Sequence, residues 1–342
     1  MTRRNEDLPD FTGAARLFNY YQGANRKFPI DLGGERFMLK LTEPLEPSPK
    51  HPSMVSRANA PVSEYLGCHV FELAGLPVQE TLLGTFDGEP AVACKDFIFA
   101  MPGGAGRYVL SEFSSIATEM CGSSGVGRTP GIEVILGTLR GYPGLEPLRE
   151  AAEERFWRTF AVDALIGNFD RHCGNWGYIV DAAQGGLVGL APVYDCGSSL
   201  YSRISLEGMA ERLSDERAFR ARVRDQPRPC LAVGGKPRPT FESILSGEYG
   251  GLAGAALAWV REAVNMEDVY GMVESTPGLA EVQVEFYKTA LRLRMEEVVE
   301  RGARAGRAAG VSMAASPELS RSVSAAMGAV GPGGGTTSAR GL

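Results

Sequence analysis

The segment Gly167-Asn168-Phe169-Asp170-Arg171-His172-Cys173-Gly174-Asn175-Trp176-Gly177 is followed a short distance later by Tyr194-Asp195-Cys196-Gly197. An Asp, an Asn five positions after it and a later Asp-x-Gly form an arrangement that transfers phosphoryl groups. That chemistry needs an aligned hydroxyl and neutralised phosphate charge. We therefore predict Asp170 as the general base, and Asn175 and Asp195 as oxygen ligands of Mg²⁺.

Turns are the alternative explanation for both segments, because Asp, Asn and Gly are common in turns. The order and spacing of the two segments, placed after a plausible nucleotide-binding part, favour a site. His172 is a further catalytic candidate, although a hydrogen bond that braces the loop is its simpler role. Arg171 is expected to pair with a phosphate or a carboxylate, or else to be a structural or solvated arginine.

Two β-hairpins and a helix are predicted before these segments. The first hairpin, over 28–41, turns at Gly33-Gly34, and the second, over 81–98, turns at Asp87-Gly88. Between them, apolar side chains recur at helical spacing over 62–76. This part of the chain therefore predicts the order strand, strand, helix, strand, strand.

Three features of this part are candidates for nucleotide binding. Lys40 follows an apolar run, so on a strand covered on both faces it would point into a cleft and meet phosphates; a surface lysine is the alternative. Glu64 begins the helix, and either pairs with Lys40 or is a first-turn glutamate favoured by the helix dipole. Gly23-Ala24-Asn25-Arg26-Lys27 offers backbone amides that could cradle phosphates, or is an ordinary surface turn.

The rest of the chain is predicted to be mainly helical. Residues 102–131 are rich in Gly and Ser and are expected to form a connecting segment with irregular parts. A helix is expected over 145–166, and a hairpin over 178–190 should bring Asn175 and Asp195 together at its open end. Further amphipathic helices are expected over three ranges: 207–222, 255–272 and 280–303.

The two ends of the chain are expected to lack regular structure. Residues 1–14 are predicted to be a loose lead-in. Residues 306–342 are rich in Ala, Gly and Ser and are predicted to be a disordered tail, because they offer little apolar surface to bury.

Composition and charge narrow the class of protein. Of the 342 residues, 44% are hydrophobic and 22% charged, and the net charge is −6, which is typical of a globular chain and disfavours nonspecific binding to nucleic acid or anionic membrane. The six cysteines show no C-x-x-C spacing, which disfavours zinc and favours reduced thiols. No signal peptide or apolar run of ~20 residues is visible, so we expect a cytoplasmic location and no membrane span; export by a signal-less route stays open.

On these residues the chain resembles the HipA-like serine/threonine kinases, whose fold is a divergent protein kinase. The resemblance extends from about residue 17 to 300, and it is most specific at 168–175, which match the family's catalytic loop, and at 194–200, which match its metal segment. Lys95-Asp96-Phe97 falls where the family's hinge strand holds the adenine. The family's phosphate loop, nucleotide-lysine strand and Asn-Glu-Tyr helix start resemble these segments: Gly23-Ala24-Asn25-Arg26-Lys27, Phe37-Met38-Leu39-Lys40 and Ser63-Glu64-Tyr65-Leu66.

The resemblance implies an α+β fold of the divergent bilobal protein-kinase type, with a small β-rich N-lobe over 15–98 and a larger helical C-lobe over 99–305. It implies an ATP- and Mg²⁺-dependent protein serine/threonine kinase, which transfers the γ-phosphoryl group to a protein hydroxyl. A protein substrate follows, and an antitoxin or other regulatory partner is a further expectation. The implied ATP-binding residues are Gly23, Ala24, Asn25, Lys27, Lys40, Glu64, Lys95 and Phe97.

The chain departs from the longer members of this family at its N-terminal end. Their extra N-terminal subdomain is expected to be absent, because the predicted phosphate loop begins near residue 20, as in the short, CtkA-type members. Some relatives carry a switching serine just before that loop. Tyr20 and Tyr21 occupy this stretch here, so we do not expect regulation by that serine.

Two other functions remain as alternatives. A non-catalytic nucleotide-binding module, or a partner protein of a toxin–antitoxin system, would bind without transferring phosphate. A metal-dependent phosphoesterase is suggested by a loose similarity of residues 167–170 to metallophosphatase loops. Two-metal sites of that kind use several histidines, whereas this chain has three, His51, His69 and His172, which disfavours the phosphoesterase.

Overall fold

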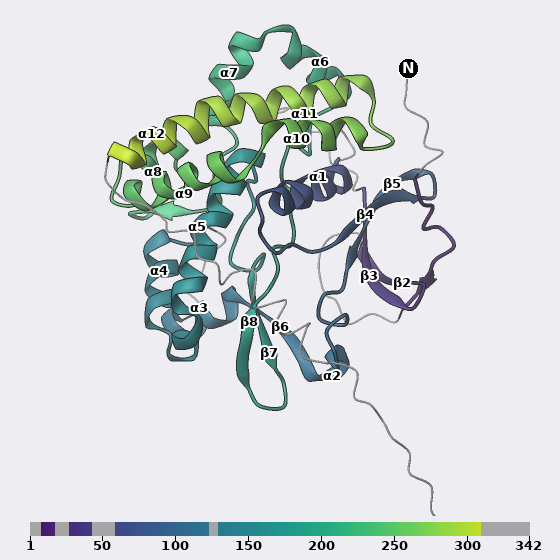
Figure 1. The fold of residues 1–342 in the computed structure, drawn as a ribbon, viewed down its shortest axis with the longest axis vertical. Coiled ribbons are helices and arrows are strands. Elements are labelled where there is room, and N and C mark those ends of the chain that lie inside the picture. Colours follow the sequence, from purple (N-terminus) through teal and green to yellow (C-terminus); the bar gives the residue numbers. More distant parts are fainter. Residues whose placement is uncertain (1–7, 18–26, 43–58, 123–128, 309–342) are drawn as a thin grey trace, which may run out of the picture.

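The computed structural model describes residues 8–17, 27–42, 59–122 and 129–308. An antiparallel sheet and a larger helical part lie on either side of helix α1, Ala60–Leu73 (Figure 1). The sheet has five strands in the order β1-β2-β3-β5-β4. The bounds of these strands are β1 Ala15–Arg16, β2 Lys27–Leu32, β3 Glu35–Leu41, β4 Thr81–Phe86 and β5 Glu89–Lys95. Both predicted hairpins and the helix between them therefore form, within an α+β fold.

The register of the sheet separates two sets of side chains. Lys27 pairs with Lys40, and Phe37 pairs with Lys95. Partners in antiparallel strands point to the same face, and successive residues alternate between faces. Lys27 and Lys40 therefore share the face that looks toward the helical part, whereas Lys95 points to the opposite face with Phe37.

The opposite face of the sheet has a small core of its own, which includes Phe11, Ile30, Phe37 and Leu39. Residues 8–14, predicted to be a loose lead-in, instead lie along strand β4. The N–H of Phe11 donates to the carbonyl of Thr85 at 2.8 Å, and Phe11 is 3% exposed. The prediction was wrong here because one buried aromatic side chain and a few backbone hydrogen bonds fix a segment that has no periodic pattern.

Gly84→Ala is expected to lower the free energy of unfolding by about 1–3 kcal/mol, because overpacking forces the backbone apart. A Cβ atom at position 84 would overlap the carbonyl of Pro9 and the ring of Phe11. Gly13→Ala is the control within the same segment, since its Cβ would meet nothing within 4 Å. Urea denaturation measures both variants, and equal stability of the two would show that residues 9–11 do not pack on β4.

The helical part contains a second, three-stranded sheet in the order β6-β7-β8. Strand β6, Tyr108–Glu112, pairs with β7, Gly177–Asp181, and β8 spans Gly186–Leu190. The predicted hairpin over 178–190 is thus confirmed. The segment over 102–131, predicted to be a connection with irregular parts, also contains regular elements that were not predicted, namely β6 and helix α3, Phe113–Cys121. Neither element is strongly periodic, and β6 forms through a partner strand that lies far along the chain.

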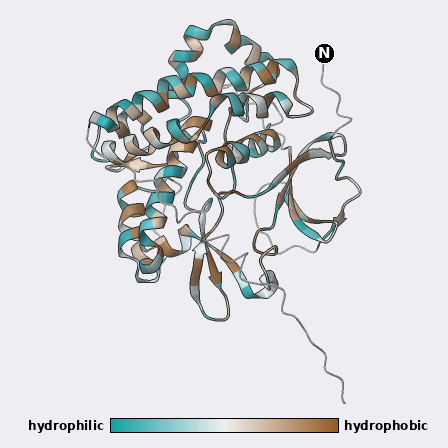
Figure 2. Cartoon of the chain, viewed as in Figure 1, coloured by the Kyte–Doolittle hydropathy of each residue, from teal (hydrophilic) through white to brown (hydrophobic). Residues whose placement is uncertain are grey.

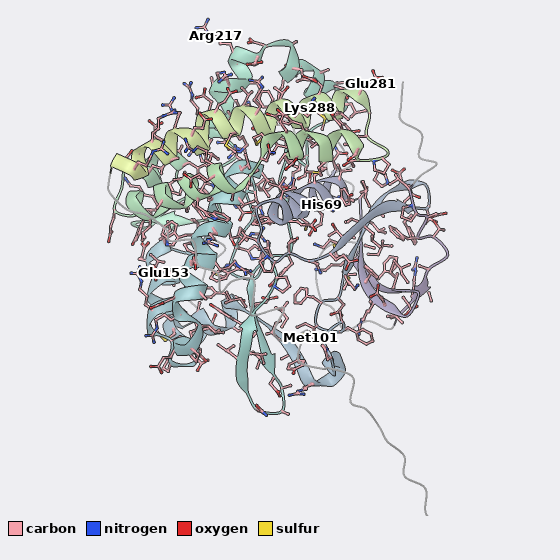
Figure 3. The ribbon with its side chains drawn as sticks, viewed as in Figure 1. His69, Met101, Glu153, Arg217, Glu281 and Lys288 are labelled. Atoms are coloured by element: carbon pink, nitrogen blue, oxygen red, sulfur yellow. The ribbon has the colours of Figure 1, made fainter. Side chains whose placement is uncertain are left out.

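The remaining helices surround a large apolar core that also includes the inner side of α1. Their outer sides are hydrophilic (Figure 2), and Arg217 points outward from α7 (Figure 3). The bounds are α2 Gly104–Arg107, α4 Ile132–Gly141, α5 Arg149–Ile166, α6 Leu206–Ser214, α7 Glu216–Asp225, α8 Phe241–Leu245, α9 Gly250–Ala263, α10 Met266–Ser275, α11 Glu281–Arg294 and α12 Glu300–Ala308. A 3₁₀ turn, Pro143–Leu148, precedes α5, and a π turn, Met295–Val299, joins α11 to α12. Two short strands, β9 Ala232–Val233 and β10 Lys236–Pro237, pair with each other.

Two of the predicted long helices are in fact helix pairs. Asp215 separates α6 from α7, and its carboxylate accepts a hydrogen bond from the N–H of Ala218. Asn265 does the same between α9 and α10, where it accepts from the N–H of Glu267. Capping side chains of this kind begin a new helix inside an apparently continuous pattern. Helix α12 extends to Ala308, past the predicted lobe end at 305, and the tail over 309–342 lies outside the described residues.

None of the helices described here is both long and apolar enough to cross a bilayer. The boundary between the two lobes, at residue 98, stays a prediction.

Candidate active site

A cleft of about 870 Å³ opens between the sheet and the helical part. Met38, Lys40 and Cys94 line it from the sheet. Residues of the two quoted segments line it from the other side, namely His172, Gly174, Asn175, Tyr194 and Asp195. The cleft therefore brings together residues far apart in the sequence, such as Lys40 and Asp195, which are separated by 155 positions.

Lys40 is the centre of an ion-pair network at the back of this cleft. Its Nζ lies 3.0 Å from Oε2 of Glu64 on helix α1 and 3.2 Å from Oδ1 of Asp195. Burial lowers the pKa of Lys40, but the two carboxylates outweigh burial and raise it well above its ordinary value. The Lys40 ammonium in turn lowers the pKa of Asp195. Lys40 is thus a fixed cation and Asp195 a fixed anion at neutral pH.

The loop that carries Asp170 begins where α5 ends, at Gly167 in a left-handed conformation. The N–H of Asp170 donates to Oδ1 of Asn168 at 3.0 Å, and its carbonyl accepts from Nδ2 of Asn175 at 2.8 Å. The backbone of Asp170 is therefore held on both sides. Among the described residues, no hydrogen bond engages the Asp170 carboxylate, and Asp170 is not one of the residues that line the cleft.

The hydrogen bond of Asn175 also decides which of its atoms faces the cleft. Because Nδ2 donates to Asp170, the amide oxygen of Asn175 is left for another partner. Asp195 supplies a carboxylate to the same cleft, and its side chain is 43% exposed. An amide oxygen and a carboxylate fit Mg²⁺, which takes its other ligands from phosphate and water. The described residues contain no cluster of three or more His, Cys, Asp or Glu side chains that could hold a metal by themselves.

Arg171 joins the two quoted segments to each other. Its guanidinium forms a two-pronged ion pair with Asp163 of α5, at 2.9 and 3.1 Å. It also donates to the carbonyl of Asn175 at 3.0 Å and to the carbonyl of Tyr194. Of the roles predicted for Arg171, the structure supports the structural one, with a carboxylate partner. Asp163 was missed from the sequence, because nothing in a helical pattern marks a carboxylate that receives an arginine from the next loop.

Helix α1 approaches the metal segment very closely. A Cβ atom at Gly67 would lie 2.8 Å from Cβ of Cys196 and 3.1 Å from Oγ of Ser199. One turn earlier on the helix, the carbonyl of Ser63 accepts a hydrogen bond from Oγ of Ser199 at 3.3 Å. A residue without a side chain at position 67 therefore lets α1 lie against Cys196 and Ser199, which follow Asp195.

The other predicted site residues are placed as follows. Lys27 and Phe97 line the cleft, and the Phe97 ring lies 6.0 Å from that of Tyr194. The imidazole Nδ1 of His172 accepts from the N–H of Gly174 at 3.0 Å, so His172 does brace its loop. Gly23, Ala24 and Asn25 lie outside the described residues.

Lys95 does not reach the cleft. Its ammonium pairs with Glu35 at 2.7 Å and with Glu80 at 3.1 Å, on the face of the sheet away from Lys40. Its N–H donates to the carbonyl of Glu80, and its own carbonyl accepts from Gln79. We therefore remove Lys95 from the candidate ATP contacts. The register between β3 and β5, which the sequence alone does not give, is what places Lys95 on that face.

The chain is similar to known kinases in both sequence and structure. A model of the HipA-like C-terminal domain family matches residues 20–246. The serine/threonine-protein kinase CtkA of Helicobacter pylori (strain J99 / ATCC 700824) is 30% identical over 281 residues, which cover 82% of this chain and 82% of the relative. The crystal structure of a Helicobacter pylori proinflammatory kinase CtkA superposes with a TM-score of 0.76 at 27% identity, covering 88% of this chain and 99% of that chain.

A more distant likeness concerns the fold alone. HipA of Shewanella oneidensis MR-1, solved with HipB and operator DNA as a toxin–antitoxin complex, superposes with a TM-score of 0.53 at 16% identity. The match covers 86% of this chain and 68% of that chain. Together these likenesses confirm the predicted α+β fold of the divergent kinase type.

Proposed function

Because the chain belongs to the HipA-like C-terminal domain family, we propose that it is an ATP- and Mg²⁺-dependent protein serine/threonine kinase. The observation that carries this proposal is the pairing of Lys40 with both Glu64 and Asp195, at 3.0 and 3.2 Å, within one cleft. In protein kinases the pair of a strand lysine and a helix glutamate must be in place before phosphoryl transfer. Here this pair is already formed.

We assign the phosphate end of the cleft to Lys40 and Lys27. Both side chains lie on the same face of paired strands, and both line the cleft. Two ammonium groups on this face would stabilise the charge of a triphosphate. When bound, Mg²⁺ would neutralise further phosphate charge, and the Asn175 oxygen and the Asp195 carboxylate are the groups that would hold it.

The adenine end is assigned to the residues that follow strand β5. Among the described residues, the backbone N–H and C=O of Phe97 take part in no hydrogen bond, although they follow a strand that is otherwise fully paired. A base could therefore receive the hydrogen bonds that the sheet leaves open. Phe97 itself and Met38 offer apolar contacts to the plane of the base.

The acceptor hydroxyl is assigned to Asp170. Its carboxylate has no partner within the described part of the chain, and its backbone is fixed by Asn168 and Asn175. A serine or threonine hydroxyl of the substrate would donate its proton to this carboxylate as the phosphoryl group arrives. His172 would hold the loop rather than move a proton, because Nδ1 already accepts from Gly174.

The partner of this reaction is a protein with an accessible hydroxyl. A regulatory or antitoxin partner, no direct contact with nucleic acid, and a cytoplasmic location stay predictions. The phosphoesterase alternative gains no support, because His69 lies on α1, where its Nδ1 is 2.9 Å from the carbonyl of Tyr65, and does not join His172 in the cleft.

Incubation with [γ-³²P]ATP and Mg²⁺ tests the proposal. Label on the protein itself or on a generic acceptor such as casein is the expected result. Bound ATP without label on either would favour the non-catalytic module, and release of phosphate from a phosphoester without ATP would favour the phosphoesterase.

Asp195→Asn is expected to lower phosphoryl transfer on the order of 10²–10³-fold and to raise the Mg²⁺ concentration needed for half-maximal rate. The substitution removes the carboxylate that both binds metal and pairs with Lys40. Asp215→Asn is the control, since asparagine caps a helix as well as aspartate does, and it should behave like wild type. An Mg²⁺ titration of the initial rate measures both, and an unaltered titration curve for Asp195→Asn would contradict the assignment.

A further inference from the structure

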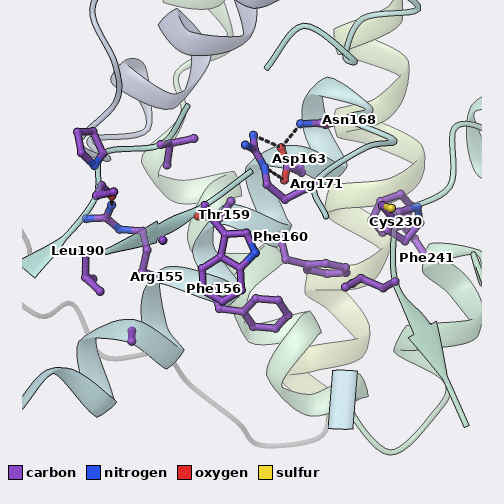
Figure 4. A pocket seen from close by; sticks show the side chains of 18 residues that line it. Arg155, Phe156, Thr159, Phe160, Asp163, Asn168, Arg171, Leu190, Cys230 and Phe241 are labelled. Carbon is purple, nitrogen blue, oxygen red and sulfur yellow. Dashed lines mark hydrogen bonds and ion pairs between the residues drawn. The ribbon is translucent and has the colours of Figure 1, made fainter. Parts of the chain in front are cut away.

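A second cavity, of about 50 Å³, lies directly behind the loop that carries Asp170 (Figure 4). One wall is a face of α5, on which Arg155, Thr159 and Asp163 recur at helical spacing. Asn168 and Arg171 of the loop form a second wall. The remaining walls are mainly apolar and include Phe156, Phe160, Trp176, Leu190 and Phe241.

Arg155 is the unusual residue of this cavity. It is 6% exposed, its Nε has no hydrogen-bond partner, and its Nη1 lies 3.5 Å from the carbonyl of Ala191. Among the described residues, no carboxylate lies within ion-pair distance of its guanidinium. Burial and the neighbouring Arg158 lower the pKa of Arg155 to about 10, so the side chain is still charged at neutral pH.

Other buried arginines among the described residues have more partners, although Nε of Arg158 and Nη2 of Arg294 also lack a hydrogen bond. Arg171 has the carboxylate of Asp163, and Arg158 has that of Glu154. Arg294, which is fully buried, donates to the carbonyl of Ala164 at 2.7 Å and reaches two further carbonyls. A buried guanidinium without such partners is costly to maintain. Arg155 is therefore poised for an anion that enters the cavity.

We propose that this cavity is a binding site for a small monocarboxylate, whose two oxygens pair with the Arg155 guanidinium and whose short hydrocarbon body packs on Trp176 and Leu190. The planar fork of an arginine matches two carboxylate oxygens. A phosphate would bury further charged oxygens against Phe156 and Phe241, which cannot bind them. The volume limits the ligand to a few non-hydrogen atoms.

The position of the cavity couples it to the loop. Arg171 and Asn168 contact the cavity with the same side chains that hold Asp163, Asn175 and the backbone of Asp170. A ligand that fills the cavity would add contacts to Arg171 and Asn168, the side chains that hold the loop. We therefore expect binding to slow amide hydrogen exchange over residues 168–175. Binding does not depend on the proposed kinase activity.

The test uses the full chain and three probes, acetate, propionate and butyrate, at constant ionic strength set with NaCl. Calorimetric titration should show saturable binding of at least one carboxylate, and its neutral amide should bind about tenfold more weakly or worse, as expected for loss of a charged hydrogen-bonded pair. Arg155→Met should weaken carboxylate binding by a similar factor without lowering the thermal midpoint, because it removes an unpaired buried charge. Hydrogen exchange with and without ligand reports the effect on residues 168–175.

Two further variants complete the design. Arg155→Lys keeps the charge without the planar fork and should bind the carboxylate with intermediate affinity. This variant tests the role of residue 155 should Arg155→Met fail to fold. Arg304→Met removes the same charge from an exposed position of α12 and should bind like wild type. Four results would each overturn the proposal. They are equal affinity for a carboxylate and its amide, wild-type affinity in both Arg155 variants, tighter binding of inorganic phosphate than of any carboxylate, and no saturable binding of any probe.

Discussion

Asp170→Asn is expected to lower the rate of phosphoryl transfer by about 10²–10⁴-fold while ATP binding stays largely intact. The amide keeps the size of the side chain but cannot accept the proton of the substrate hydroxyl. The contacts that position residue 170 use its backbone N–H and carbonyl, so they survive the substitution. The loss should therefore appear in kcat, with little change in the affinity for nucleotide.

Single-turnover kinetics with labelled ATP measures the rate, and titration with a fluorescent ATP analogue measures binding. Asp225→Asn is the matched control, because Asp225 is exposed at the end of α7, where it pairs with Arg228. A rate for Asp170→Asn equal to that of the control would sink the role given to Asp170. Equal loss of binding and rate would instead show that the loop had been displaced.

Breaking the buried pair of Asp163 and Arg171 is expected to have the second large effect. Asp163→Leu leaves the Arg171 guanidinium buried without its counter-ion, which costs about 3–5 kcal/mol of stability. The double variant Asp163→Leu/Arg171→Met should recover much of that stability, since apolar residues of similar volume replace a buried pair with little cost. It should not recover phosphoryl transfer, because Arg171 also holds the carbonyls of Asn175 and Tyr194.

Denaturant unfolding of the two single variants and the double variant gives the coupling energy of the pair. Arg140→Met, which breaks an exposed ion pair with Glu153, is the control and should change stability by less than about 1 kcal/mol. Recovery of activity in the double variant would contradict the role given to Arg171 as the link between the two loops.

The local patterns of the sequence were sufficient to predict the hairpins and helix α1, whereas the roles of the site residues stay predictions. The hairpin over 178–190 was expected to bring Asn175 and Asp195 together, and both line the same cleft, whereas Asp170 is not among the residues that line it. Contacts that depend on tertiary folding were not predictable in this way. Asp163 receives its arginine only because the loop after α5 turns back, and strand β6 exists only because β7 lies beside it.

The structure was also needed to tell apart lysines that look alike in the sequence. Lys40 and Lys95 both end apolar strand segments, yet the first faces the cleft and the second pairs with Glu35 and Glu80 on the other face. The hydrogen bond from Nδ2 of Asn175 to the carbonyl of Asp170 likewise depends on the folded geometry of the loop, so the sequence could not predict it.

The contact of Gly67 with Cys196 and Ser199 has a consequence for how the proposed kinase could be switched. Many protein kinases are turned off when the helix with the glutamate moves outward and separates it from the lysine. Here Gly67 of that helix lies against the side chains of Cys196 and Ser199, and the Ser199 hydroxyl donates a hydrogen bond to the carbonyl of Ser63. Any outward movement of α1 would break this contact and expose Leu66 and Val70. We therefore expect control of the activity to act through access to the cleft, with the Lys40–Glu64 pair permanently assembled.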